Sequence, residues 1–129
     1  MTESSLIGPV EIRVPPDPSL SRVLRLAASG MASIAGFTVD EIEDIKIAVS
    51  EVLIALIEHG DGKPVDVQFE VDSQSFKLRG RSIVEKFDVN HPDLALCRSV
   101  LAGVCSSHTI DLVENQAHIW AEVTHLTIE

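Results

Sequence analysis

The segment from Thr38 to Gly60 limits the fold of this chain more than any other segment. Thr38 and Glu41 have the spacing of a capping box, in which each side chain accepts a hydrogen bond from the backbone N–H of the other residue. An apolar stripe at three- and four-residue spacing follows, made of Ile42, Ile45, Val49, Val52, Leu53 and Leu56. The pattern predicts an amphipathic helix that runs to about His59 and buries one face against another layer.

Other stretches predict strands, because apolar and polar residues alternate in them or because a turn pairs them with a neighbour. They are Val10 to Val14, Val65 to Val71, Ser75 to Arg81, Thr109 to Val113 and Ala117 to Ile128. Two further helices are expected, one between Pro18 and Gly36 and one that begins near Pro92. The apolar stripe expected on the first of these is Leu20, Val23, Leu24, Ala27, Met31 and Ile34.

The order of these elements predicts the fold class. Most strands come in consecutive pairs joined by short turns, which favours a mixed, mostly antiparallel sheet. The helices must then cover the sheet, so we expect an α/β fold, a two-layer α/β sandwich with three helices on one face. A chain of 129 residues suits one domain. We expect a flexible leader over residues 1–8 and a single domain over residues 9–129.

Composition excludes several classes of protein. There are 20 Asp and Glu residues against 10 Lys and Arg, a net charge of −10. This charge argues against nucleic acid and against anionic membrane surfaces as partners. A hydrophobic content of 45% is too high for a disordered acidic tail. Two cysteines make no disulfide framework, and no signal peptide is recognisable at the start, so a cytoplasmic protein is the simplest interpretation.

One line on the helix from Thr38 to His59 combines carboxylates with small residues, and a site could lie there. This line is Asp44, Ala48, Glu51, Ala55 and Glu58. Glu51 is either a retained site residue or a solvated helix carboxylate. His59 is expected at the C-terminal end of the helix, where a positive charge is favoured. The histidines lack metal-ligand spacing with each other or with the cysteines, so no metal site is expected.

Residues 42–60, IEDIKIAVSEVLIALIEHG, resemble the conserved helix of the histidine-kinase-like ATPases. More narrowly, they are similar to the anti-sigma-factor serine kinases of the RsbW and SpoIIAB type. The matching residues are Ile47 to Glu51 and Glu58 to Gly60, and the stretch from Gly36 to Glu41 matches the junction that precedes this helix in the family. The order of strands and helices agrees over residues 10–126. The resemblance implies the same fold.

The family's nucleotide motifs are changed in this chain. The resemblance implies that Glu51 would be the catalytic base, but Ala55 stands where the family has an Asn that binds magnesium. Gly80 is the one glycine left in the adenine motif. Asp93 and Ala95 replace the glycines of the phosphate motif. We therefore expect no cofactor and weak or lost ATP binding, the alternative being a chain that still uses ATP and Mg²⁺.

The resemblance also implies protein partners: a sigma factor, and an antagonist of the STAS fold that competes for the same protein. Arg22, Arg25 and the strand from Val10 to Val14 are candidate contacts, and a homodimer is implied. The expected function is therefore an anti-sigma-like regulator that acts by partner switching. The alternatives are an active serine/threonine kinase that phosphorylates the STAS antagonist with Mg-ATP, and a scaffold with other partners.

Overall fold

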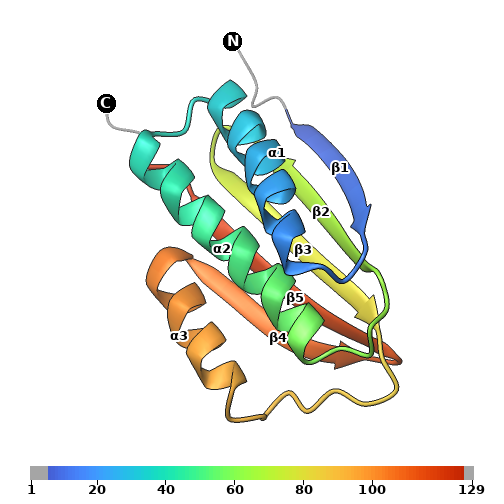
Figure 1. The fold of residues 1–129 in the computed structure, drawn as a ribbon. Helices are drawn as coiled ribbons and strands as arrows, with labels where there is room; N and C mark the ends of the chain where they lie inside the picture. Colours follow the sequence, from blue (N-terminus) through green and yellow to red (C-terminus); the bar gives the residue numbers. More distant parts are fainter. Residues whose placement is uncertain (1–5, 127–129) are drawn as a thin grey trace.

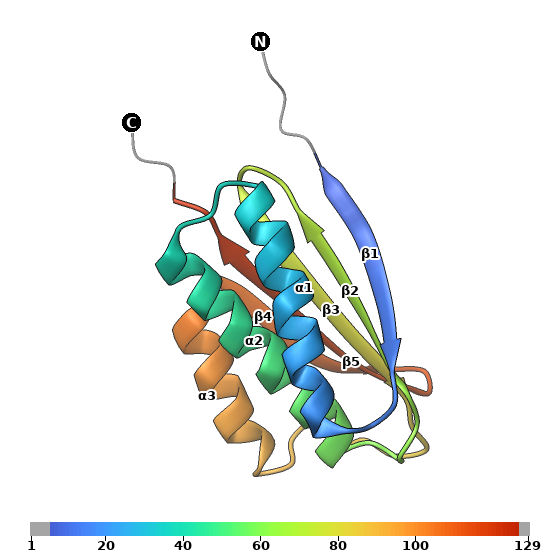
Figure 2. The same ribbon diagram turned by 45° about the horizontal axis from the view of Figure 1, so that its top comes forward.

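The computed structural model describes residues 6–126 and places a sheet in one layer and three α-helices in the other (Figure 1). The elements are β1 (Ile7–Val14), a 3-10 turn (Pro18–Leu20), α1 (Ser21–Ile34), α2 (Val39–Glu58), β2 (Val65–Val71), β3 (Ser75–Ile83), α3 (Leu94–Val104), β4 (Ser107–Val113) and β5 (Gln116–Thr124). Figure 2 shows the helices side by side on one face of the sheet. The predicted two-layer α/β sandwich is confirmed.

The sheet has five strands in the order β1-β2-β3-β5-β4. β2 and β3 form one hairpin and β4 and β5 another, and β3 pairs with β5 at the centre. β1 adds to the outer side of β2. We expected a mixed, mostly antiparallel sheet. All four strand pairings among residues 6–126 are antiparallel.

The central strands bury alternate residues against the helices. β2 alternates strictly between buried and half-buried positions along Val65–Val71, and β5 alternates in the same way over most of its length. Side chains on a strand point to opposite faces in turn, so one face of the sheet meets the helices while the other stays accessible to solvent. The core therefore lies in one layer between the sheet and the three helices.

The helix ends follow local signals. α1 ends before Gly36, whose φ of 86° is a conformation that glycine adopts without strain. Thr38 then caps α2: its hydroxyl accepts a hydrogen bond from Glu41 N–H at 3.1 Å, and the Glu41 carboxylate accepts one from Thr38 N–H at 2.8 Å. The predicted capping box is thus confirmed.

Some expectations need correction. In the predicted stripe of α1, Val23 is 48% exposed and Ile34 is 75% exposed. Leu24 and Met31 of the predicted stripe are buried as expected, and Ala28 and Ala32 complete the face of α1 that packs on α2 and the sheet. An apolar stripe on a helix can be wider than the surface that its neighbours cover, and the spacing alone does not show which edge of the stripe stays outside.

Element boundaries also differ in places. β1 begins at Ile7, before the expected start at Val10, and β3 continues to Ile83. α3 begins at Leu94, so Pro92 lies in the turn before the helix. Residues 1–5 of the expected leader, and Ile128 at the end of the expected last strand, lie outside the described residues. No helix within residues 6–126 is long and apolar enough to cross a membrane.

Candidate functional site

A cavity of about 240 Å³ lies between the C-terminal half of α2 and the beginning of α3. These two helices run side by side in Figures 1 and 2. The lining residues are Glu51, Ile54, Ala55, Glu58, His59, Asp93, Leu94, Leu96 and Cys97. The cavity thus brings together Glu51, Ala55 and Asp93, three of the positions that the sequence singled out. Its walls come from two stretches that are distant in the sequence, residues 51–59 and residues 93–97.

Glu51 is the half-buried carboxyl group of this cavity. Burial raises the pKa of Glu51, and the negative charge of Glu58 raises it further. The Cys97 thiol on α3 is affected in the same way: burial, and then the charge of Glu51, raise its pKa to about 11. Cys97 is therefore a protonated thiol at neutral pH, and Glu51 is a carboxyl group whose environment favours binding a proton. Such a group is suited to accept a proton from a hydroxyl.

Ala55 follows Glu51 by four residues, so both side chains lie on the same face of α2. The Ala55 side chain is 4% exposed and forms part of the cavity wall. It offers a methyl group and no ligand atom. The oxygen donors in the lining are the carboxylates of Glu51, Glu58 and Asp93, and the lining contains no Lys or Arg.

Asp93 precedes α3 and is exposed at the cavity. Its side chain makes no capping hydrogen bond to the helix. Ala95 is exposed and is not among the cavity-lining residues. Gly80 is also outside the lining: a Cβ placed there would lie 2.7 Å from Val52 Cγ1 and 2.8 Å from Leu56 Cδ1. Gly80 therefore allows β3 to pack closely beneath α2.

The segment between β3 and α3 is held at several points. Val84 and Phe87 are buried in the core. The Asp61 carboxylate accepts a hydrogen bond from Glu85 N–H, and the Arg98 guanidinium donates to the Val89 carbonyl. This segment brings His91 beside His59, with the ring centroids 4.9 Å apart. One ligand atom each of His59, His91 and Asp93 lie within 4.8 Å of one another, a group that spacing along the chain did not reveal.

The two arginines proposed as partner contacts differ in their surroundings. Arg22 is exposed on α1. Arg25 is half-buried, and its Nη1 donates hydrogen bonds of 2.9 Å to the hydroxyls of Ser21 and Ser50. Arg25 therefore ties α1 to α2 at the residue next to Glu51. The partner-binding role of both arginines stays a prediction.

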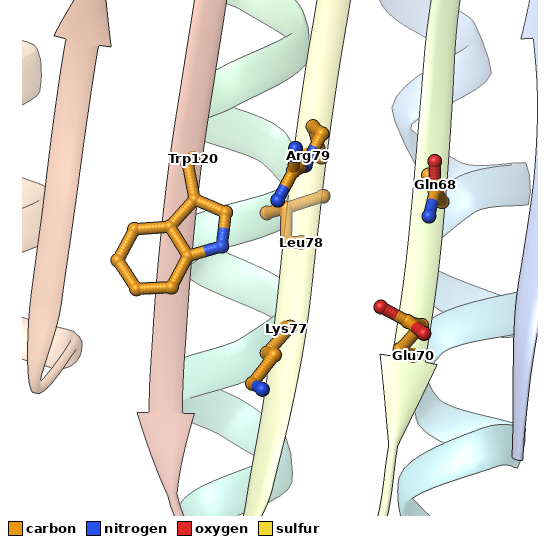
Figure 3. A pocket seen from close by; sticks show the side chains of 6 residues that line it. All are labelled: Gln68, Glu70, Lys77, Leu78, Arg79 and Trp120. Atoms are coloured by element: carbon orange, nitrogen blue, oxygen red, sulfur yellow. The ribbon is translucent and has the colours of Figure 1, made fainter. Parts of the chain in front are cut away.

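A second hollow lies on the face of the sheet that points away from the helices (Figure 3). It is lined by Gln68, Glu70, Lys77, Leu78, Arg79 and Trp120. Its volume of about 10 Å³ leaves room for about one water molecule. Of these two, the cavity between α2 and α3 is the better candidate for a functional site, because it is larger and contains the predicted site residues.

Comparisons with known proteins agree with the fold and with the motif in α2. The family model of the histidine kinase-like ATPase domain matches residues 14–103. The serine-protein kinase RsbW of Bacillus velezensis is 30% identical over 112 residues, which cover 84% of this chain and 67% of the relative. RsbW of Bacillus subtilis is 33% identical over 106 residues, which cover 79% of this chain and 63% of the relative. This chain thus spans about two thirds of the length of these relatives.

Two solved structures share the fold. The RsbU and RsbW domains of a Mycobacterium tuberculosis protein match with a TM-score of 0.67 at 16% identity, over 91% of this chain and 32% of that one. The SiaB–SiaC complex of Pseudomonas aeruginosa matches with a TM-score of 0.62 at 13% identity, over 89% of this chain and 88% of that one. The family model and the RsbW relatives show that this chain belongs to the histidine kinase-like ATPase family and, within it, to the RsbW-like group.

Proposed function

We propose that this chain is a protein-binding regulator of the anti-sigma-factor type, which acts by partner switching and does not depend on ATP. One observation carries the second part of the proposal. Residue 55, where the family resemblance places a magnesium-binding Asn, is an alanine whose side chain forms part of the cavity wall. Magnesium prefers hard oxygen ligands in a strict octahedral arrangement, and a methyl group supplies none.

The charges around the cavity support the same proposal. Asp93 stands where the resemblance places a phosphate-binding glycine, and Glu51 and Glu58 add two further carboxylates. Two like charges about 4 Å apart repel by about 1 kcal/mol in water and by more in a partly buried site. With no Lys or Arg in the lining to offset this repulsion, the residues present do not fit a magnesium nucleotide.

Without a nucleotide, switching would depend on the relative affinities of two protein partners. A sigma factor presents a basic DNA-binding face, and the net charge of −10 on this chain would speed association with such a surface. A STAS-fold antagonist would compete for the same protein. Arg22 on the exposed side of α1 and the edge strand β1 are the proposed contacts, and a homodimer through the same elements is part of the proposal.

The test is nucleotide binding followed by partner capture. Calorimetry and thermal unfolding with millimolar Mg-ATP should show no binding heat and no rise in the melting temperature. A bound ligand at 100 times its Kd would add about 2.7 kcal/mol of stability, so binding is easily detected. Purified sigma factors and STAS proteins should each form a complex with the chain and should displace one another. Saturable Mg-ATP binding would overturn the ATP-independent part, and failure of both partner classes to bind would overturn the rest.

An active protein kinase is the second candidate, and Glu51 favours it. Its carboxyl lies in the cavity with a raised pKa, as a base for a serine hydroxyl should. Transfer of labelled γ-phosphate from ATP to a STAS protein would establish this activity, provided that Glu51→Gln abolishes the transfer. No transfer to any STAS protein that binds the chain would leave the binding module as the function.

A further inference from the structure

His59, His91 and Asp93 come together from two separate parts of the chain. His59 is the residue that ends α2, while His91 and Asp93 lie in the turn that leads into α3. One ligand atom of each residue lies within 4.8 Å of the other two. The two histidines are half-buried and Asp93 is exposed, so an ion from solvent can reach all three side chains.

His91 and Asp93 each present an identified ligand atom at this point. The Asp93 N–H donates a hydrogen bond of 3.1 Å to His91 Nδ1, so this nitrogen carries a lone pair, as a metal ligand must. The Asp93 carboxylate makes no capping hydrogen bond and lies 3.9 Å from the same nitrogen. An ion bound at Nδ1 would take the place of the N–H donor and would draw the carboxylate closer.

The electrostatic surroundings favour a cation. His59 stands at the C-terminal end of α2, where the free carbonyl groups carry partial negative charge. The nearby cavity is lined by Glu51 and Glu58 and by no Lys or Arg. The chain as a whole carries a net charge of −10. Every one of these contributions has the sign that stabilises a bound positive ion.

The backbone that carries the cluster is held in place. Asp88 accepts hydrogen bonds from the N–H groups of Asn90 and His91, through its side chain and its carbonyl respectively. Leu94 N–H donates to the His91 carbonyl, and the Leu94 side chain is buried in the core. A site held in this way loses little conformational entropy when it binds an ion.

We propose that His59, His91 and Asp93 bind a divalent transition-metal ion of the zinc class. Two imidazoles and a carboxylate suit zinc, copper or nickel, whereas magnesium prefers oxygen ligands alone. Tetrahedral zinc at its usual bond lengths needs ligand atoms about 3.3 Å apart, so each pair has to close by at most about 1.5 Å. Rotation of the accessible side chains provides this movement. Three protein ligands leave a fourth position for water.

The bound ion would join the end of α2 to the turn before α3, at the rim of the cavity. The proposed site is argued from these three side chains and their surroundings, so it does not depend on the proposed function. Its chemistry also differs from that of a magnesium nucleotide site, because the ligands are mainly nitrogen atoms.

The test uses the full chain without a histidine tag, after treatment with a chelator. Zinc titrated by calorimetry should bind with one ion per chain and should raise the melting temperature. Cobalt(II) should give the visible absorption of an ion with mixed nitrogen and oxygen ligands. His91→Ala and Asp93→Asn should each weaken binding more than about tenfold. Magnesium should give neither heat nor a thermal shift in the same range.

The matched control is His118→Ala, which removes another half-buried histidine on β5. This variant should bind zinc like the parent chain, and circular dichroism should confirm that all three variants are folded. Zinc affinity equal to that of the parent in the His91→Ala and Asp93→Asn variants would overturn the proposal. So would equal weakening by all three changes, or an absence of zinc binding by the parent chain.

Discussion

Both ends of α2 carry glutamate side chains, but among the described residues only those at the N-terminal end have hydrogen-bond donors around them. At the N-terminal end, the Glu41 carboxylate accepts hydrogen bonds from Thr38 N–H, from Leu126 N–H at 2.7 Å and from His125 Nδ1 at 2.7 Å. The His125 ring also stacks on Phe37 with centroids 4.7 Å apart. At the C-terminal end, the described part of the chain shows no hydrogen bond or ion pair to the carboxylates of Glu51 and Glu58.

The pKa values follow this difference. Burial alone would raise the pKa of Glu41, but the hydrogen bonds from Thr38, Leu126 and His125 lower it to about 2. Burial and the charge of Glu58 raise the pKa of Glu51. A carboxylate with many donors stabilises the fold, whereas a carboxyl group with a raised pKa in a cavity is a candidate functional group. The first end of α2 therefore stabilises the fold, and the proposed site lies at the second end.

The largest expected effect tests whether the two ends share one core. Ile45 and Leu56 are both buried, one in each half of α2. Replacing either by Ala should lower the free energy of unfolding by about 2–5 kcal/mol, because each change leaves a cavity. Urea unfolding measures both. A loss below about 1 kcal/mol for Leu56→Ala alone would mean that the C-terminal half of α2 is loosely packed. The two ends would then differ in packing as well as in their polar contacts.

Removal of the Glu41 side chain should have the next largest effect. Glu41→Ala leaves two backbone N–H groups and His125 without their acceptor, which should lower the stability by about 2 kcal/mol. Chemical unfolding at neutral pH is the measurement. The matched control is Glu58→Ala at the other end, which should stay within about 0.5 kcal/mol of the parent. Equal losses at both ends would contradict the division of roles.

The cap itself should contribute less. Thr38→Ala removes the acceptor for Glu41 N–H and should lower the stability by about 1 kcal/mol. Thr38→Ser keeps a hydroxyl at the same place and should retain most of the stability. If the serine variant lost as much as the alanine variant, the hydroxyl would not be what stabilises the start of the helix.

The last comparison is the pH dependence of stability, in which the contribution of Glu51 is the smallest expected effect. Glu41 has a folded pKa of about 2 against an ordinary value of 4.5, so the unfolded chain takes up its proton first. Its stabilisation is complete above about pH 4.5 and is lost as the pH falls towards 2. The folded pKa of Glu51 is raised, so the folded chain takes up this proton first. The stability linked to Glu51 therefore decreases as the pH rises from 4.5 through the raised pKa.

Unfolding curves between pH 3 and pH 7 separate the two carboxyl groups. Glu41→Gln should flatten the loss of stability in acid. Glu51→Gln should remove the small decrease at higher pH and should stay within about 0.5 kcal/mol of the parent. A Glu51→Gln variant that loses stability at neutral pH would show that this carboxylate is structural after all.

Contacts between residues that are close in the sequence could be predicted from the sequence. The capping box depends on residues three positions apart, and it was predictable because both partners lie in one helical turn. His125 and Leu126 stand 84 and 85 positions from Glu41, and no local pattern indicated that they return to it. The contact between His59 and His91 was not predictable either, because these residues are also distant in the sequence and meet only through the packing of α3 beside α2.

The candidate site was predictable in part. The helical spacing put Glu51 and Ala55 on one face, and the resemblance led to Asp93; the structure places all three at one cavity. Gly80 and Ala95 came from the same motifs, yet neither lines the cavity, because Gly80 lies beneath α2 and Ala95 faces solvent. Motif positions identify a stretch of chain, whereas the direction of each side chain depends on tertiary packing.

The burial patterns of the five strands have a consequence for hydrogen exchange. Within the described residues, β1 buries only Val14 and β4 buries only Ile110, whereas β2, β3 and β5 bury every second residue over most of their length. Amides of strands with few buried contacts should exchange through local opening, and those of the central strands should exchange through larger unfolding events. We therefore expect a slowly exchanging centre of three strands and two edges that open to solvent, or to another chain, without loss of the fold.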